Sequence, residues 1–214
     1  MNRTNLLSRA EGSRVRAGIF VSALLVSLLA AFPSIAQLKT HPAVEVLQPN
    51  YSFQKTLVSL REFDPKNNEV VFFGGKGSRD FHVHLRNGNY EKHYRVGGDN
   101  VGLEWIKYIG SDGSAPDYAV AYYTWIAWVA SSSDFGVVQL MRIEGGRLHV
   151  DQQILFNLRG SEKAGAYFNA KSNTLTIRGV NEWEHCCPTG LDVVRFQLKD
   201  GVLKQIHYGT APLE

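Results

Sequence analysis

The sequence predicts an all-β domain built from antiparallel hairpins, and three features indicate this class. Short apolar or alternating segments recur along the chain after residue 54, separated by Gly, Asn, Asp and Ser. No long segment with helical periodicity follows the first 36 residues. Three pairs of segments are joined by Asn87-Gly88, Gly145-Gly146 and Asp200-Gly201, dipeptides that favour tight hairpin turns. We expect a sandwich or a curved meander, with a small barrel or a partial propeller as the alternative.

The first 36 residues predict a secretory signal peptide. Four arginines precede the apolar run Ala17–Phe32. After the run, Ser34 and Ala36 place small side chains at −3 and −1 of a cleavage site before Gln37. The run has 16 residues, fewer than the roughly 20 that span a bilayer. The alternative is an uncleaved segment that anchors the protein in the membrane. We expect a periplasmic or secreted protein with one domain over residues 37–214.

The charges of this expected mature chain balance. The full chain has 23 Lys and Arg against 20 Asp and Glu, which gives a net charge of +3. Residues 1–36 hold four of the basic side chains and one of the acidic ones, so 19 of each sign remain. Nucleic-acid binding relies on an excess of basic side chains that displaces counterions. The composition therefore argues against nucleic acid and against stable membrane insertion after cleavage, and favours a protein or small-molecule partner.

The expected strands are short runs rich in β-branched and aromatic residues, and most of them end at turn-forming residues. In chain order they lie at Lys55–Leu60, Val70–Phe73, Phe81–Leu85, Tyr90–Val96, Leu103–Ile109, Tyr118–Val129, Val137–Ile143, Leu148–Phe156, Tyr167–Asn169, Thr174–Arg178, Asp192–Leu198 and Leu203–Tyr208. Residues 37–54 follow a less regular pattern, and we expect them to wrap an edge of the domain.

The segment Tyr118–Val129 reads YAVAYYTWIAWV and is apolar or aromatic at both odd and even positions. A strand with one face in water would alternate, so this pattern predicts a central strand that is covered on both faces. The alternative is an aromatic platform on which sugars or aromatic ligands stack. Aromatic residues in strands belong to the core more often, which favours the first interpretation.

The first hairpin predicts a cluster of imidazoles. A two-residue turn at Asn87-Gly88 places His84 opposite Glu91 and His82 opposite His93. Directly opposed residues have Cβ atoms about 4.5–5.5 Å apart, so these four side chains would share one face. Such a face could hold zinc or copper. The alternative is an ordinary solvated face with no cofactor, which is the interpretation that we favour.

The stretch EWEHCCPTG holds the only two cysteines, Cys186 and Cys187. An exported protein meets an oxidising compartment, where a disulfide between them is plausible. Adjacent Cα atoms lie about 3.8 Å apart, below the usual disulfide range of about 4.4–6.8 Å, so this bond would be strained and easily reduced. Pro188 and Thr189 complete the turn. Three interpretations stay open: a vicinal disulfide that locks a turn, two buried free thiols, or a redox-active or metal-binding pair.

The sequence contains no established catalytic motif: the nucleophile elbow GxSxG, the zinc motif HExxH, the SxxK motif and the phosphate loop are all missing. The acidic residues are scattered, so spacing nominates no carboxylate pair. We therefore expect a non-catalytic binding or interaction module with a Cys-Cys-Pro turn. The alternative is a redox-active or metal-handling protein that works through the cysteines or the histidine cluster.

The residues Cys186, Cys187, Pro188 and Thr189, followed by a strand and a hairpin at Asp200-Gly201, resemble a pattern in the LppP/LprE-type family of bacterial exported proteins. The likeness covers a small part of the chain, and this chain lacks the lipidation cysteine of such lipoproteins. The resemblance implies an envelope or secreted setting and implies no particular activity.

Overall fold

A computed structural model describes residues 43–49, 51–74, 79–110, 117–129, 131–181 and 190–213. These residues form antiparallel sheets with one short 3-10 turn, η1 (Leu60–Glu62), and none of the sheets closes into a barrel, so the predicted all-β class is confirmed. The strands are β1 (Val44–Leu47), β2 (Tyr51–Thr56), β3 (Glu69–Phe72), β4 (Phe81–His84), β5 (Asn89–His93), β6 (Gly98–Ile109), β7 (Tyr118–Val129), β8 (Ser131–Glu144), β9 (Arg147–Asn157), β10 (Gly165–Asn169), β11 (Thr174–Val180), β12 (Leu191–Lys199) and β13 (Val202–Ala211).

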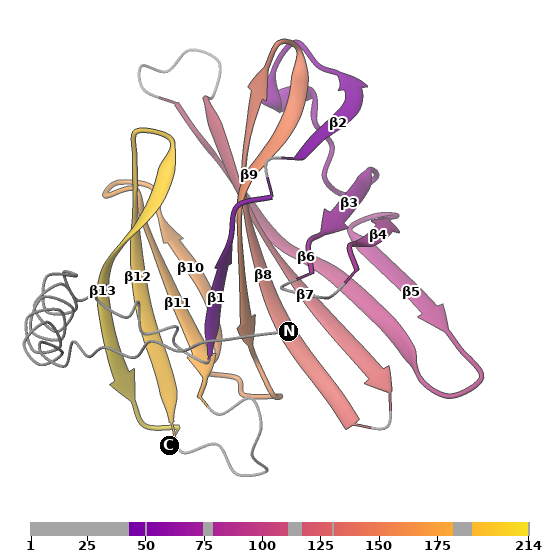
Figure 1. Cartoon of the computed structure of the whole chain (residues 1–214), viewed down its shortest axis with the longest axis vertical. Coiled ribbons are helices and arrows are strands. Elements are labelled where there is room, and N and C mark those ends of the chain that lie inside the picture. Colours follow the sequence, from indigo (N-terminus) through magenta and orange to yellow (C-terminus); the bar gives the residue numbers. More distant parts are fainter. Residues whose placement is uncertain are drawn as a thin grey trace, which may run out of the picture. The chain divides into compact units, whose positions relative to one another are not determined.

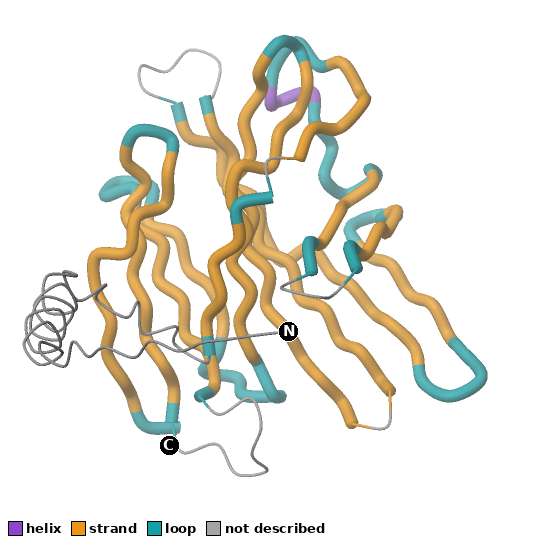
Figure 2. The backbone as a smooth tube through the Cα atoms, in the orientation of Figure 1, coloured by secondary structure: helices purple, strands orange, loops and turns teal. Residues whose placement is uncertain are grey.

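The strands form a layered arrangement within the unit Thr40–Glu214. The central sheet has the order β1-β9-β8-β7-β6-β5, and β2 also pairs with β9. The sheet β10-β11-β12-β13 covers one face of it, and the two-stranded sheet β3-β4 covers part of the other face together with β2 and η1. Figure 1 shows these covering elements on opposite sides of the central sheet, and Figure 2 shows that nearly all the backbone that it colours is strand or tight turn. No helix in the described part is both long and apolar enough to cross a membrane.

Strand β7 confirms the prediction of a strand covered on both faces. It lies between β6 and β8 in the central sheet. Ala119, Ala121 and Tyr123 belong to the core under β3-β4, whereas Val120 and Tyr122 belong to the core under β10–β13. All five are buried, so the aromatic residues of this half of the strand are core residues rather than an open stacking platform.

Two consecutive glutamines of β9, Gln152 and Gln153, attach the covering layers to the central sheet. Gln153 accepts a hydrogen bond from the backbone N–H of Phe73 (3.0 Å) and donates one to the Phe73 carbonyl (2.8 Å). Gln152 does the same with Leu203 of β13, at 2.6 Å and 3.4 Å. Because successive side chains of a strand point to opposite faces, one glutamine serves each layer. Both side-chain amides are buried. Each of these bonds therefore supplies a backbone N–H or carbonyl with a partner in place of water.

The hairpin predictions are partly confirmed. The turns at Gly145-Gly146 and Asp200-Gly201 join the paired strands β8-β9 and β12-β13. At Asn87-Gly88 the tight turn forms, with positive φ at both residues and reciprocal backbone bonds between Arg86 and Asn89 of 2.8 and 3.0 Å.

Beyond that turn the predicted pairing is wrong, because β4 pairs with β3 and β5 pairs with β6. The backbone around the turn is bonded elsewhere: Gly88 donates to the Lys66 carbonyl, and the Gly88 carbonyl accepts from Leu103, both at 2.8 Å. These bonds hold the turn between a loop and β6, so the two arms diverge.

The N-terminal strands also differ from expectation. Strand β1 was not predicted, and the strand expected at Lys55–Leu60 lies earlier, as β2. The chain leaves the sheet after Thr56, and Leu57, Leu60 and Phe63 are then buried at intervals of three residues. Such spacing suits an irregular segment with a 3-10 turn and not a strand, in which inward residues recur every second position.

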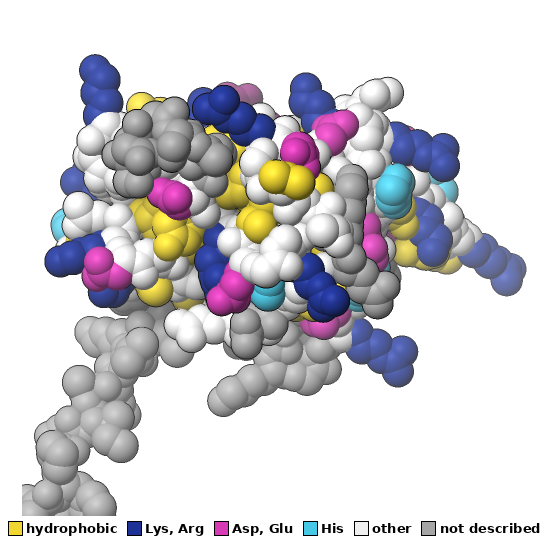
Figure 3. Space-filling view, turned by 90° about the horizontal axis from the view of Figure 1, so that it is seen from above, with side chains coloured by type: hydrophobic (Ala, Val, Ile, Leu, Met, Phe, Trp, Pro, Cys, Tyr) yellow, Lys and Arg dark blue, Asp and Glu magenta, His cyan; other side chains and the backbone are white. Residues whose placement is uncertain are grey.

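Seen from above in Figure 3, the surface carries basic and acidic side chains side by side, with hydrophobic side chains exposed in small groups between them. Interspersed charges of both signs agree with the balanced composition of residues 37–214. A concentration of one sign on a single face would therefore be a local feature of the fold and not a consequence of overall charge.

Candidate functional site

The cysteine turn, Cys186, Cys187, Pro188 and Thr189, lies outside the described residues, so the three interpretations of the pair remain predictions. Titration of thiols in the denatured, unreduced protein distinguishes them. We expect no free thiol and a monomer whose mass rises by about 2 Da on reduction, because each cysteine has only the other as an intrachain partner. Two titratable thiols would contradict the vicinal disulfide.

The four residues of the predicted metal cluster are divided between two sheets. His82 and His84 lie on β4, whereas Glu91 and His93 lie on β5. His82 Nδ1 contacts Glu69 Oε1 at 2.8 Å, and His93 Nε2 contacts Glu91 Oε1 at 2.9 Å. In the described part of the chain, no group of three or more His, Cys, Asp or Glu side chains is placed to hold a metal. His82 and His93 are therefore not opposed on one face, because β4 does not pair with β5.

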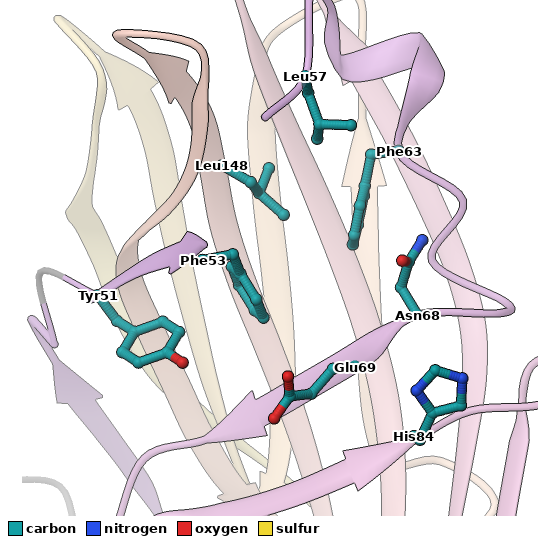
Figure 4. Close-up of a pocket in the computed structure, with 8 residues that line it drawn as sticks. All are labelled: Tyr51, Phe53, Leu57, Phe63, Asn68, Glu69, His84 and Leu148. Carbon is teal, nitrogen blue, oxygen red and sulfur yellow. The ribbon is translucent and has the colours of Figure 1, made fainter. Parts of the chain in front are cut away.

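A pocket of about 500 Å³ opens between β2, the loop that contains η1, and the start of β3. This volume lies within the range of about 300–1,000 Å³ that is usual for small-molecule sites. Figure 4 shows that the side chains converge on it from these elements and from β4 and β9. The lining residues are Tyr51, Phe53, Leu57, Phe63, Asn68, Glu69, His84 and Leu148.

The inner part of this pocket is apolar. Leu57, Phe63 and Leu148 are nearly fully buried in the core under β3-β4. The loop that supplies two of them is fixed at both ends, since Leu57 N–H donates to the Gly146 carbonyl (2.7 Å) and Tyr108 Oη donates to the Phe63 carbonyl (3.3 Å). The apolar wall is therefore built by bonded backbone and is formed before any ligand arrives.

The outer part of the pocket is polar. Glu69 and His84 are directly opposed on β3 and β4 and point to the same side. Glu69 holds His82 through its carboxylate. No hydrogen bond or ion pair to another described residue engages the His84 side chain, which is exposed. The rim thus offers a carboxylate and an imidazole at one end of an apolar cavity.

Tyr51 lies between the apolar and polar parts. Its ring contacts Phe53 edge to face at a centroid distance of 5.1 Å and His82 at 6.4 Å. Burial raises the pKa of the Tyr51 hydroxyl, and the nearby charges of Glu69 and Asp80 raise it further. The hydroxyl is therefore a neutral hydrogen-bond donor at physiological pH. Among the described residues that line the pocket, Glu69 is the one carboxylate.

The lining residues of this pocket have only weak signals in the sequence. The alternation of Tyr51 and Phe53 around Ser52 is the pattern of a strand, but the surrounding residues 37–54 are irregular and do not favour one. Leu148 and Phe63 are far apart along the chain, and they line one pocket only in the folded protein. For a pocket made by such long-range contacts, periodicity carries no information.

We compared the chain with known proteins in three ways. A scan against protein-family models found no matching family, and searches of curated proteins and of solved structures returned no similar protein.

Proposed function

We propose that this chain is an exported, non-catalytic binding module whose pocket takes a small ligand with an apolar body and a cationic head. The observation that carries the proposal is the combination of a preformed apolar cavity of about 500 Å³ with one carboxylate, Glu69, at its rim. Binding sites of this kind are mainly apolar and contain few polar groups, which orient the ligand.

The sign of the head group follows from the rim. Leu57, Phe63 and Leu148 would contact the apolar body, and each methylene moved out of water contributes about 0.8 kcal/mol. Glu69 would accept a charge-assisted hydrogen bond from an ammonium group, which contributes about 1.5–3 kcal/mol where water is partly excluded. A carboxylate in the same place would be repelled. The pocket therefore favours an alkyl or aryl amine over the corresponding acid.

A pair of ligands with equal chain length tests this preference. We expect the neutral dye N-phenyl-1-naphthylamine to gain fluorescence with a Kd of roughly 0.1 mM, as efficiencies of about −0.3 kcal/mol per non-hydrogen atom imply. Octylammonium should displace the dye, and octanoate should compete at least about fivefold less well because of Glu69. Dye that does not bind, or octanoate that competes as well as octylammonium, would contradict the proposal.

Matched substitutions locate the site. Glu69→Gln should abolish the difference between octylammonium and octanoate, whereas Glu91→Gln, which removes the same type of carboxylate from a histidine contact on β5, should preserve it. His84→Trp should weaken dye binding by covering the pocket mouth, and His93→Trp serves as its control. Equal effects within either pair would place binding elsewhere.

A further inference from the structure

The outer face of the sheet β10–β13 carries an exposed tyrosine and several basic side chains, which do not belong to the pocket lined by Glu69. Phe168, Leu175 and Ile177 are buried toward the central sheet. Because side chains alternate along a strand, Tyr167 and Thr176 lie on the outer face. Tyr167 is 67% exposed, although it is a large aromatic residue. An exposed tyrosine ring offers a flat apolar surface against which a ligand can pack.

A row of directly opposed residues crosses this face. Tyr167 lies opposite Thr176, and Thr176 lies opposite Arg195. Adjacent strands are about 4.8 Å apart, so the backbones of Tyr167 and Arg195 are separated by about 10 Å, with Thr176 between them. Arg178 lies two residues along β11 from Thr176, at the diagonal position beside Arg195. Two guanidinium groups and one aromatic ring thus border the same space.

This space is a pocket of about 420 Å³. Its described lining residues are Lys163, Gly165, Ala166, Tyr167, Thr176, Arg178 and Arg195, which include three cations and, within the described ranges, no carboxylate. None of the three cations forms an ion pair with another residue in the described ranges. Among the described residues close to these cations in the chain, Glu162 is exposed, and Asp192, the acidic residue of the four strands, is buried.

Such a group of cations is unfavourable when empty, since like charges at neighbouring sheet positions repel one another. An anion placed between them removes the repulsion, and the planar guanidinium group matches carboxylate and phosphate oxygens with two parallel hydrogen bonds. The overall charge of the chain gives no reason for this concentration, because residues 37–214 are balanced. The local arrangement therefore indicates a small anionic ligand rather than a long polyanion.

We propose that this second pocket binds an anionic sugar, that is, a sugar ring that bears a carboxylate or a phosphate group. Arg178 and Arg195 bind the anionic group, and Lys163 adds positive charge beside it. The ring of Tyr167 packs against the apolar face of the sugar, and the Thr176 hydroxyl lies beneath the ring to exchange hydrogen bonds with its hydroxyl groups. The span of about 10 Å between Tyr167 and Arg195 accommodates one sugar ring together with its anionic group.

Titration of the purified protein with D-glucuronate, D-glucose 6-phosphate and D-glucose, followed by calorimetry or by NMR shifts, tests this assignment. At least one anionic sugar should bind about tenfold or more tightly than glucose, and the comparison of the two identifies the preferred anion. If neither binds better than glucose, the proposal is overturned. Binding of phosphatidylglycerol vesicles without binding of either anionic sugar would also overturn it, in favour of a membrane contact.

Substitutions separate a built site from general attraction. Arg178→Gln and Arg195→Gln should each weaken binding of the preferred sugar by about tenfold, whereas Arg147→Gln, which removes the same charge from an exposed position on β9, should leave it unchanged. Tyr167→Ala should weaken the sugar and leave binding of inorganic phosphate unaffected. An equal loss in the Arg147 variant would reduce the effect to long-range charge and overturn the proposal. Since all these side chains are exposed, the variants should keep the wild-type Tm.

Discussion

Replacing Gln153 with leucine is expected to lower the free energy of unfolding by about 3 kcal/mol. The side chain is fully buried, and its amide satisfies both the N–H and the carbonyl of Phe73. Leucine has a similar size but no polar atoms, so two buried backbone groups lose their partners, each at a cost of about 1–3 kcal/mol. Gln139 also loses the oxygen to which it donates at 3.1 Å. Urea unfolding at equilibrium measures the difference.

The consequence should be specific to the layer that Gln153 holds. Hydrogen exchange should rise in β3 and β4, which have no backbone pairing with the central sheet, and should rise less in β10–β13. Gln197→Leu is the matched control, because Gln197 is an exposed glutamine on a strand, where substitutions change stability by less than about 0.5 kcal/mol. A loss for Gln153→Leu as small as the control would show that the amide does not hold the layer.

Strand positions in this chain are predictable from the sequence, whereas the roles of Gln152 and Gln153 are not. Nearly all strands after residue 68 lie where the sequence predicts them, because β-branched and aromatic runs between turn residues are local signals. The pattern of Tyr118–Val129 even predicted burial on both faces, since a strand covered on both sides must be apolar at every position. Gln152 and Gln153 carry no such signal. Polar residues inside a strand indicate an exposed face unless the partner groups are known, and here the partners are backbone atoms 51 and 80 residues away.

At the first hairpin, the turn is predictable from the sequence but the strand pairing is not. Asn87 and Gly88 adopt the positive φ values that their residue types allow, so the turn itself was predictable. Which strands then pair is decided by burial elsewhere: Val83 and Leu85 are packed in the core under β3-β4, while β5 extends β6 at the edge of the central sheet. The metal-cluster hypothesis was built on this pairing and not on the turn, so the register that the structure shows removes the face from which it was argued.

Replacing Gly136 with alanine is expected to lower the free energy of unfolding by about 2–4 kcal/mol, although alanine is the smallest possible change. Gly136 lies directly opposite Phe156, whose ring covers the glycine and packs against Tyr122 at a centroid distance of 5.8 Å. A Cβ at position 136 would overlap the Phe156 ring at Cζ. The ring is fully buried in the core under β10–β13, so we expect it to take a strained rotamer or to displace these strands. Thermal or urea unfolding measures the loss.

Two variants show whether the ring is the cause. In Gly136→Ala/Phe156→Leu the atoms that meet the new methyl group are gone, so the double variant should be more stable than the sum of the single losses predicts, by about 1 kcal/mol or more. Gly102→Ala is the control in the same sheet, because the closest approach of its Cβ would be 3.2 Å, to the Thr124 hydroxyl oxygen. Its other neighbours, Asn89 Oδ1 and Glu104 Oε1, are ends of exposed side chains at 3.7 and 3.8 Å. If the two single glycine variants lose equal stability, or if the double variant is simply additive, steric contact with Phe156 does not explain why position 136 is glycine. If the coupling appears, then the pairing of a glycine with an aromatic ring across β8 and β9 sets how closely the layer β10–β13 approaches the central sheet, and the sheet that carries Arg178 and Arg195 is positioned by a residue that has no side chain.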